Sequence, residues 1–300
     1  MIKRTLYFGN PAYLSIKDQQ LQVKLPEKEE LRTVPIEDIG VVVLDHWQIS
    51  ITQRVFESLL ANNAAIITCN SSHMPQGLLL NLEGNTLQSE RFRHQINASE
   101  PLKKRLWQQT VQSKILNQAK VLEERGIDVQ NMKYWASEVK SGDVDNHEAR
   151  AAAYYWSQLF PSIPNFTRGR YDDPPNHFLN YGYAILRAVV ARALVSSGLL
   201  PTLGIHHRNK YNAYCLADDI MEPYRPFVDR LVCKIVDIID VYGGFELTKE
   251  IKAILLTIPV LDIKINAQKS PLMVGISQTT ASLSKCFEGS LRKAVYPEFE

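Results

Sequence analysis

The chain has 300 residues, 45% of them hydrophobic, with 34 Lys and Arg against 32 Asp and Glu, which gives a formal net charge of +2. This composition excludes a disordered or fibrous protein, and the length favours about two domains. A charge this close to neutral argues against a nucleic-acid-binding protein unless the basic residues are gathered in particular segments.

The first eighty or so residues are predicted to form strands. Residues 21–25 alternate between apolar and polar side chains, as in a half-buried strand, and the β-branched apolar runs 41–44 and 65–68 fit buried strands. Residues 77–82 have the character of a further strand. Ser50 and Gln53 have the spacing of a capping box and precede apolar residues on one helical face, which predicts one helix in this unit.

After residue 85 the apolar residues recur at helical spacing. Helices are predicted over 92–125, 148–160, 177–197, 224–242 and 277–295. Segments containing Pro or Gly separate them, as expected where helices end. We therefore predict an α+β protein with a small β-rich domain over 1–83 and a large all-helical domain over 84–300.

The cysteines and the apolar stretches indicate the compartment. The four cysteines have no C-x-x-C spacing, which disfavours a zinc ribbon and favours free thiols in a reducing environment. The N-terminus lacks a signal-peptide pattern, and the longest apolar stretch, 183–200, contains Arg187 and Arg192. That stretch is predicted as a buried or amphipathic helix and not a membrane span, so we expect a cytoplasmic protein.

Basic residues are concentrated in two segments. Between residues 91 and 122 a single acid, Glu100, accompanies seven basic residues: Arg91, Arg93, Lys103, Lys104, Arg105, Lys114 and Lys120. No acid occurs between residues 174 and 217, a stretch that contains Arg208. Both segments could present a positive surface to phosphates, and solvated helix faces are the alternative explanation.

The strongest local signal combines imidazoles with carboxylates. Residues 206–209 read His-His-Arg-Asn, and 217–223 read Ala-Asp-Asp-Ile-Met-Glu-Pro. One helical turn would place Asp219 and Glu222 on the same face, and Pro223 favours a helix entry or a kink there.

These residue types suit a hard divalent cation. The neutral imidazole of His207 with carboxylate oxygens favours Mg²⁺ or Mn²⁺ over a structural zinc site. Glu148, which opens an Ala-rich segment, is the best local candidate for a third ligand. The alternatives are ordinary turn residues for the histidines, N-caps for Asp218 and Asp219, and a helix-dipole partner for Glu148. No Walker, GxSxG or HExxH motif is present.

At these residues the chain resembles the CRISPR-associated integrase and endonuclease family, the "protein one" of CRISPR adaptation. The resemblance is carried by four ordered blocks, 146–152, 176–183, 204–209 and 219–226, which read NHEARAA, NHFLNYGY, GIHHRN and DIMEPYRP. The last block, the unfused length and the Asn-x-Glu entry are most similar to the type II branch.

The resemblance implies a metal site and a fold. Carried over residue by residue, the catalytic metal ligands are Glu148, His207 and Glu222, with Asp219 as an alternative second acid and Mg²⁺ or Mn²⁺ as the cofactor. The implied fold is a β-sandwich-like N-terminal domain followed by an all-α domain that carries the metal site, assembled as a homodimer.

The resemblance also implies the reaction and the partners. A 3′-hydroxyl of a spacer precursor attacks a phosphodiester at a CRISPR repeat boundary, with a "protein two" dimer bridging two integrase dimers on double-stranded DNA. The basic residues expected to hold the DNA backbone are Arg91, Arg93, Lys103, Lys104, Arg105, Arg208 and Arg225. The alternatives are a metal-dependent nuclease without an integrase role and a non-catalytic DNA-binding scaffold.

Overall fold

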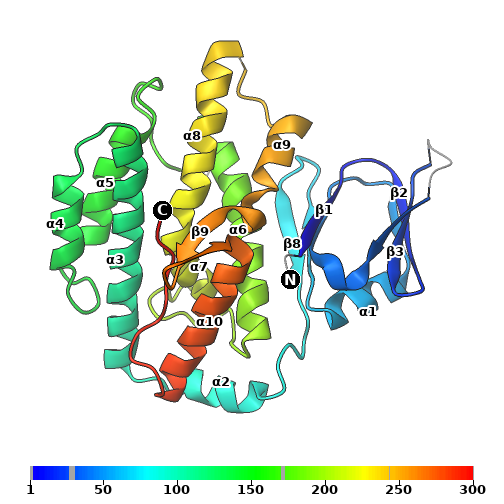
Figure 1. The fold of residues 1–300 in the computed structure, drawn as a ribbon, viewed down its shortest axis with the longest axis horizontal. Helices are drawn as coiled ribbons and strands as arrows, with labels where there is room; N and C mark the ends of the chain where they lie inside the picture. The colour runs from blue at the N-terminus through cyan, green and yellow to red at the C-terminus, as the bar shows by residue number, and fades with distance from the viewer. Residues whose placement is uncertain (1–2, 27–30, 170–172, 243, 300) are drawn as a thin grey trace.

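The computed structural model describes residues 3–26, 31–169, 173–242 and 244–299. Sheets occupy the N-terminal part of the chain and helices most of the remainder (Figure 1), which confirms the predicted α+β class. The strands are β1 (Arg4–Phe8), β2 (Ala12–Lys17), β3 (Gln20–Lys24), β4 (Leu31–Pro35), β5 (Ile39–Leu44), β6 (Ile49–Ile51), β7 (Ala65–Cys69), β8 (Pro75–Leu79), β9 (Asp262–Ile265) and β10 (Gln268–Pro271).

Apart from α1, the helices follow the two N-terminal sheets in sequence, and β9 and β10 lie between α9 and α10. The helices are α1 (Gln53–Ala61), α2 (Gln88–Ile96), α3 (Glu100–Glu124), α4 (Gln130–Glu138), α5 (His147–Leu159), α6 (Asn176–Ser196), α7 (Cys215–Met221), α8 (Arg225–Tyr242), α9 (Lys249–Leu255) and α10 (Leu272–Glu288). Short 3₁₀ turns occupy Ile36–Asp38, Glu222–Tyr224 and Ile258–Val260.

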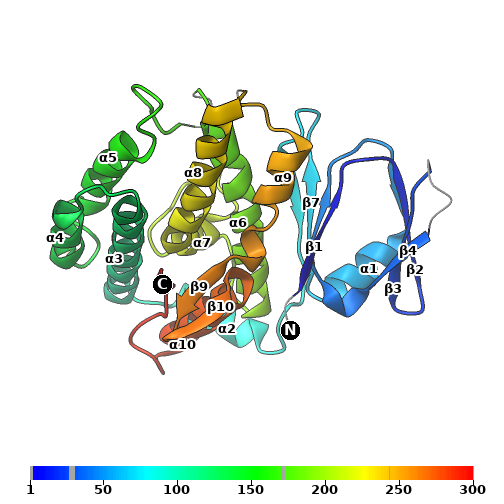
Figure 2. The ribbon, with the colours of Figure 1, turned by 45° about the horizontal axis from the view of Figure 1, so that its top comes forward.

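Two four-stranded sheets form the N-terminal part. The first has the order β1-β5-β7-β8, with β1, β5 and β7 parallel and β8 antiparallel. The second has the order β4-β3-β2-β6, in which only β2 and β6 run parallel. One hydrophobic core contains residues of both sheets and of α1, which lies between them in Figure 2.

Strand β5 contributes side chains to two hydrophobic cores, one between the sheets and one in the helical part. Val42 belongs to the core between the sheets, whereas Val41 and Val43 belong to the larger core of the helical part. Successive side chains on a strand point to opposite faces, so both faces of the first sheet are covered. The boundary between residues 83 and 84 stays a prediction, and the two parts share a continuous core across it.

Helix α6 is the central element of the helical part. It packs against α7, α8 and α10, and it also contacts β7 and β8 of the first sheet. Among the described residues it is the one helix long and apolar enough to cross a membrane, but 72% of the apolar window is buried inside the protein. The apolar stretch around Arg187 and Arg192 is therefore a buried helix, as predicted.

Four details differ from the sequence-based expectations. The run 92–125 is divided between α2 and α3, because Ser99 caps α3 and Pro101 lies in its first turn. The capping box was wrong: Ser50 lies in β6, and the residue that precedes α1 is Thr52. The region after residue 83 is not all-α, because β9 and β10 form a hairpin there. Finally, α10 starts at Leu272 and ends at Glu288, so the segment 290–299 continues outside any helix.

Candidate metal centre

Helix α5 presents Glu148 from its first turn. The carboxylate of Asp143 accepts the backbone N–H groups of His147 (2.9 Å) and Glu148 (3.0 Å), and Asn146 turns into the helix with φ of 53°. Asp143 thereby satisfies N–H groups that a helix start leaves open. Since that role falls to Asp143, the Glu148 side chain is available to point toward α3.

Glu222 comes from the break between α7 and α8. A 3₁₀ turn over Glu222–Tyr224 separates the two helices, which confirms the kink predicted at Pro223. Asn117 of α3 donates to the Pro223 carbonyl at 2.8 Å and so holds this turn against α3. The Glu222 side chain points inward, and the residue is only 5% exposed.

Lys114 of α3 lies between the two glutamates. Its Nζ is 2.6 Å from Glu148 Oε1 and 2.6 Å from Glu222 Oε2. Burial alone would lower the pKa of Lys114, but the charges of Glu222 and Glu148 outweigh it, and the pKa is raised. Carboxylates from two separate helical segments therefore meet around one buried positive charge.

The second oxygen of Glu222 is paired with Arg225. Arg225 Nε lies 2.8 Å from Glu222 Oε1, and the guanidinium stacks over the Tyr183 ring, 4.6 Å from its centroid. Burial would raise the pKa of Glu222, but the charges of Arg225 and Lys114 outweigh it, and the pKa is lowered. Glu222 is therefore a buried anion with two cationic neighbours, Lys114 and Arg225.

Asp219 holds the loop that carries the histidines. Its carboxylate is fully buried and accepts the backbone N–H groups of residues 205–207 at 2.7–3.1 Å. His207 Nδ1 lies 2.5 Å from Asp219 Oδ1, and this hydrogen bond is the main reason that the pKa of His207 is raised. Both Asp219 oxygens are committed to the loop, which favours a positioning role for Asp219 over metal ligation.

His206 has a different environment from His207. Its ring stacks on Trp107 of α3, with the ring centroids 4.1 Å apart and the planes 3° from parallel. Partial burial against this surface lowers the pKa of His206. His206 therefore acts as a packing residue, and the stacking fixes the neighbouring His207 in the loop.

The three predicted ligands do not form a coordination shell as they stand. Within the described residues, no three His, Cys, Asp or Glu side chains lie close enough together to hold a metal ion. One feature still fits a cation: Glu148 and Glu222 already share one positive group, the ammonium of Lys114. Hard carboxylate oxygens are the ligands that Mg²⁺ and Mn²⁺ prefer.

Comparison with known sequences identifies the family. The family model described as CRISPR associated protein Cas1 matches residues 6–259. The chain belongs to the Cas1 family. A CRISPR-associated endonuclease Cas1 of Neisseria meningitidis is 38% identical over 286 residues, which cover 94% of this chain and 91% of that relative. The family resemblance of the four sequence blocks is confirmed.

Solved structures show that the Cas1-family fold extends over nearly the whole chain. A casposase bound to integration product matches with a TM-score of 0.78 at 18% identity, covering 98% of this chain and 92% of that one. A chain of a Cas6-RT-Cas1–Cas2 complex matches with a TM-score of 0.73 at 20% identity, covering 97% of this chain and 35% of that one.

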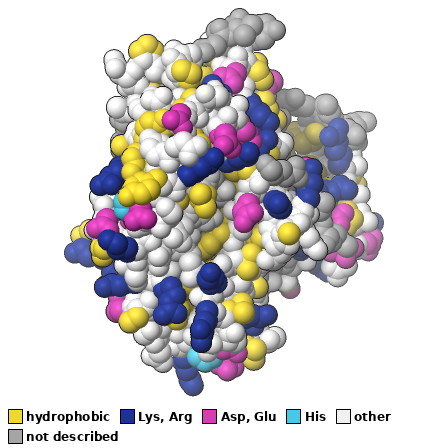
Figure 3. Space-filling view, turned by 60° about the vertical axis from the view of Figure 1, so that its left-hand side comes forward, with side chains coloured by type: hydrophobic (Ala, Val, Ile, Leu, Met, Phe, Trp, Pro, Cys, Tyr) yellow, Lys and Arg dark blue, Asp and Glu magenta, His cyan; other side chains and the backbone are white. Residues whose placement is uncertain are grey.

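The seven basic residues predicted to contact DNA fall into two groups in this Cas1-family chain. Arg91 donates to the Ser197 carbonyl at 2.8 Å, and Arg225 pairs with Glu222, so both make internal contacts. The others are at least partly exposed: Arg93, Lys103, Lys104, Arg105 and Arg208. Glu100 pairs with two of these side chains. Figure 3 shows Lys and Arg side chains mixed with Asp and Glu on one face of the molecule.

A pocket of about 470 Å³ reaches His207. Basic and amide side chains line it, among them Lys103, Arg208, Lys210, Asn209 and Asn212, together with the carboxylate of Glu100, which pairs with Lys103 and Arg208. Such side chains bind phosphate oxygens without reading base sequence. The pocket thus offers an anionic ligand a route to the histidine loop.

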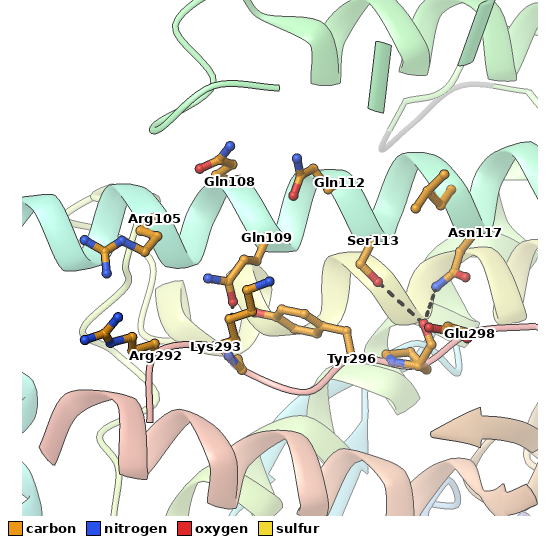
Figure 4. Close-up of a pocket in the computed structure, with 13 residues that line it drawn as sticks. Arg105, Gln108, Gln109, Gln112, Ser113, Asn117, Arg292, Lys293, Tyr296 and Glu298 are labelled. Carbon is orange, nitrogen blue, oxygen red and sulfur yellow. Dashed lines mark hydrogen bonds between the residues drawn. The ribbon is translucent and has the colours of Figure 1, made fainter. Parts of the chain in front are cut away.

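A second hollow of about 640 Å³ lies between α3 and the C-terminal segment 292–298 (Figure 4). Polar and basic side chains line it, including Arg105, Gln109, Gln112, Arg292 and Lys293. The C-terminal segment is tied to α3, because Tyr296 Oη lies 2.7 Å from Thr110 Oγ1 and Asn117 donates to the Pro297 carbonyl at 3.0 Å. The segment therefore braces the helix that carries Lys114.

Lys114 is the site residue whose role the sequence analysis missed. It was counted among the basic residues of a surface segment, but the structure buries it between two acids. The sequence contains a partial signal, because Val111, three residues before Lys114, and Ile115, directly after it, are apolar. A lysine on an otherwise buried helix face needs an anionic partner.

Proposed function

We propose that this chain is a metal-dependent DNA endonuclease and integrase of CRISPR adaptation. The observation that carries the proposal is the meeting of Glu148 and Glu222 around one buried cation, in a Cas1-family chain whose close relative is named an endonuclease. Carboxylates that converge from separate segments can hold a divalent metal ion, and such ions support phosphoryl chemistry.

The cofactor in this proposal is Mg²⁺ or Mn²⁺, held by Glu148, His207 and Glu222. When bound, the ion would make a hydroxyl group easier to deprotonate and would offset negative charge on the transition state. Asp219 orients the His207 ring through Nδ1, which leaves Nε2 as the ligand atom. Arg225 keeps Glu222 ionised and fixed in place.

The proposed reaction is transesterification at the boundary of a CRISPR repeat. The 3′-hydroxyl of the incoming spacer DNA forms one phosphodiester bond while one in the repeat breaks, so the bond count balances without a nucleotide cofactor. The basic pocket beside His207 would hold the DNA backbone close to the carboxylates. Water in place of the hydroxyl gives hydrolysis, which is the endonuclease reaction.

The proposed partners are double-stranded DNA, a second copy of this chain and a Cas2 dimer. The Cas6-RT-Cas1–Cas2 structure is named for an assembly that contains Cas2, and we extend that partnership to this chain. The DIMEPYRP block and the 38% identity to the Neisseria relative support assignment to the type II branch. We place the activity in the cytoplasm.

The test is a strand-transfer assay with a short 3′-hydroxyl duplex, a repeat-bearing plasmid, the Cas2 partner and Mg²⁺ or Mn²⁺. We expect Glu148→Gln and Glu222→Gln to lower joining by at least about 100-fold, because each removes a charge that balances the transition state. Glu123→Gln, which alters an exposed acid of α3, is the matched control and should join DNA normally.

Each alternative function predicts a different result in this assay. Cleaved DNA without any covalently joined product would favour a nuclease with no integrase role. Salt-sensitive DNA binding that is indifferent to chelator and to both substitutions would favour a non-catalytic scaffold. Normal joining by both variants would refute the assignment of Glu148 and Glu222.

A further inference from the structure

The position of Lys114 has a consequence for metal binding, and it rests on the metal site of the proposed function. The ammonium group lies 2.6 Å from one oxygen of each glutamate, and its side chain is 11% exposed. A Mg²⁺ ion bound by the same two oxygens would lie about 2.0–2.1 Å from each. The ammonium group and the ion therefore need the same space and cannot both occupy it.

The two glutamates differ in their number of cationic neighbours and in their exposure to solvent. Glu222 has a second cationic neighbour in Arg225, 2.8 Å from Oε1, so it keeps a partner if Lys114 moves away. Glu148 is paired only with Lys114 among the ion pairs of the described residues, and its side chain is more exposed, at 24% against 7% for Glu222. Removal of the ammonium group would thus leave a site that is open on the Glu148 side.

We propose that Lys114 is a built-in competitor for the metal ion. In the metal-free protein its ammonium group neutralises Glu148 and Glu222 and stabilises the packing of α3 against α5 and the Glu222–Tyr224 turn. A divalent ion must displace this group, and the flexible four-carbon stem allows the displacement without movement of α3. Lys114 therefore weakens metal binding while it stabilises the metal-free fold.

The anchoring of α3 supports a displacement confined to the side chain. Asn117, one turn further along α3, donates to the carbonyls of both Pro223 and Pro297 and is buried. The backbone of α3 is consequently fixed relative to Glu222 by contacts that do not involve Lys114. Only the lysine side chain has to change its position when an ion enters.

The test measures Mn²⁺ binding to the full-length protein without DNA, by the electron paramagnetic resonance signal of free Mn²⁺. Lys114→Met should bind one Mn²⁺ at least about tenfold more tightly than the wild type, because no cation then competes for the two carboxylates. Lys120→Met removes the same charge from a half-exposed position on α3 and should bind Mn²⁺ as the wild type does. Lys114→Arg keeps the competing charge and should bind no more tightly than the wild type.

Thermal unfolding provides an independent readout. In EDTA, Lys114→Met should unfold at a lower temperature than the wild type, and Mn²⁺ should raise its Tm by more than it raises the wild-type Tm. If Lys114→Met does not fold even with Mn²⁺, Lys114→Arg decides: tighter Mn²⁺ binding than wild type would overturn the proposal, and equal or weaker binding supports it.

The outcomes separate this inference from the proposed function. Equal or weaker Mn²⁺ binding by a folded Lys114→Met variant would overturn the competitor role and leave the metal site intact. Failure of the wild type and of every variant to bind Mn²⁺ would overturn both the metal site and the inference.

Discussion

At the scale of single residues, the buried acid Asp229 is connected to the candidate metal centre through Tyr183 and Arg225. Asp229 of α8 is fully buried and accepts hydrogen bonds from the hydroxyls of Tyr155 and Tyr183. Burial raises its pKa to about 6, although the two tyrosine hydrogen bonds oppose the rise. Tyr183 also lies under the guanidinium of Arg225, so Asp229 is linked to Glu222 through two intervening side chains.

This raised pKa predicts a pH dependence of stability. The pKa of Asp229 is about 6 in the folded protein and near 3.8 in the unfolded chain, so the folded protein binds this proton more tightly. Ionisation of Asp229 therefore lowers the stability of the folded protein as the pH rises through about 6. Through this group alone the protein should be about 1–2 kcal/mol less stable at pH 8 than at pH 5.

Chemical denaturation at both pH values tests this expectation. Asp229→Asn should lose this part of the pH dependence, whereas Asp237→Asn, which changes a half-exposed acid paired with Arg125, should keep it. Superimposable pH profiles for wild type and Asp229→Asn would show that Asp229 does not titrate in this range.

At the scale of elements, the sequence predicted those whose apolar pattern is strong. Strands β3, β5 and β7 and helices α5, α6 and α8 lie within a few residues of their predicted ranges. In β3 the buried positions alternate, whereas β5 and α6 are buried on nearly all sides, and their continuous apolar character carries the information. The break at Pro223 was predicted from the restriction that proline places on the residue before it. Glu222 nevertheless keeps helical dihedral angles (φ −53°, ψ −47°), and the break consists of a 3₁₀ turn between α7 and α8.

The elements that were missed have only a weak local signal. β9 and β10 are four-residue strands whose pairing with each other is not evident from so short a pattern. The apolar pattern continued past Gly289, but this residue takes φ of 93°, and α10 ends there.

The residues of the candidate site also differ in how far the sequence predicted them. The sequence and the family resemblance predicted Glu148, His207 and Glu222, whereas the pairing of Lys114 with two acids depends on how α3, α5 and the turn before α8 come together.

The C-terminal segment leads to a prediction about Asn117. Its side-chain amide donates to the carbonyls of Pro223 (2.8 Å) and Pro297 (3.0 Å) in the interior. Asn117→Ala would leave two buried acceptors without this donor, so we expect a loss of about 1–3 kcal/mol in the free energy of unfolding. Urea denaturation measures it, with Gln112→Ala in the nearby groove as the control. A loss of equal size in both variants would contradict the bridging role of Asn117.

At the scale of the whole molecule, one buried ion pair joins the first sheet to the helices. Lys252 of α9 lies 2.9 Å from Asp45, which directly follows β5, and both residues are buried. Tyr7 of β1 donates to the same carboxylate at 2.6 Å, and His73 Nδ1 lies 2.8 Å from it. Asp45 thus gathers three partners from the sheet and from α9.

Replacing Lys252 alone should lower the free energy of unfolding more than replacing both Lys252 and Asp45. Lys252→Met leaves the Asp45 carboxylate buried without its cation, and we expect the free energy of unfolding to fall by about 3–5 kcal/mol. Adding Asp45→Asn to Lys252→Met should recover part of this loss, because the uncompensated charge is gone. Denaturant titration of the single and double variants tests this, and a double variant less stable than Lys252→Met would contradict it.

The core that β5 shares with the helical part determines whether the β-rich part can exist as a separate fragment. Val41, Val43 and Ile67 are each at most 2% exposed because the helical part covers them. A fragment that ends near residue 83 would turn these side chains toward water as a continuous apolar strip on parallel strands, a surface that promotes self-association. The β-rich part therefore functions as one face of a common interior, and it is not a module that can be transplanted without its helices.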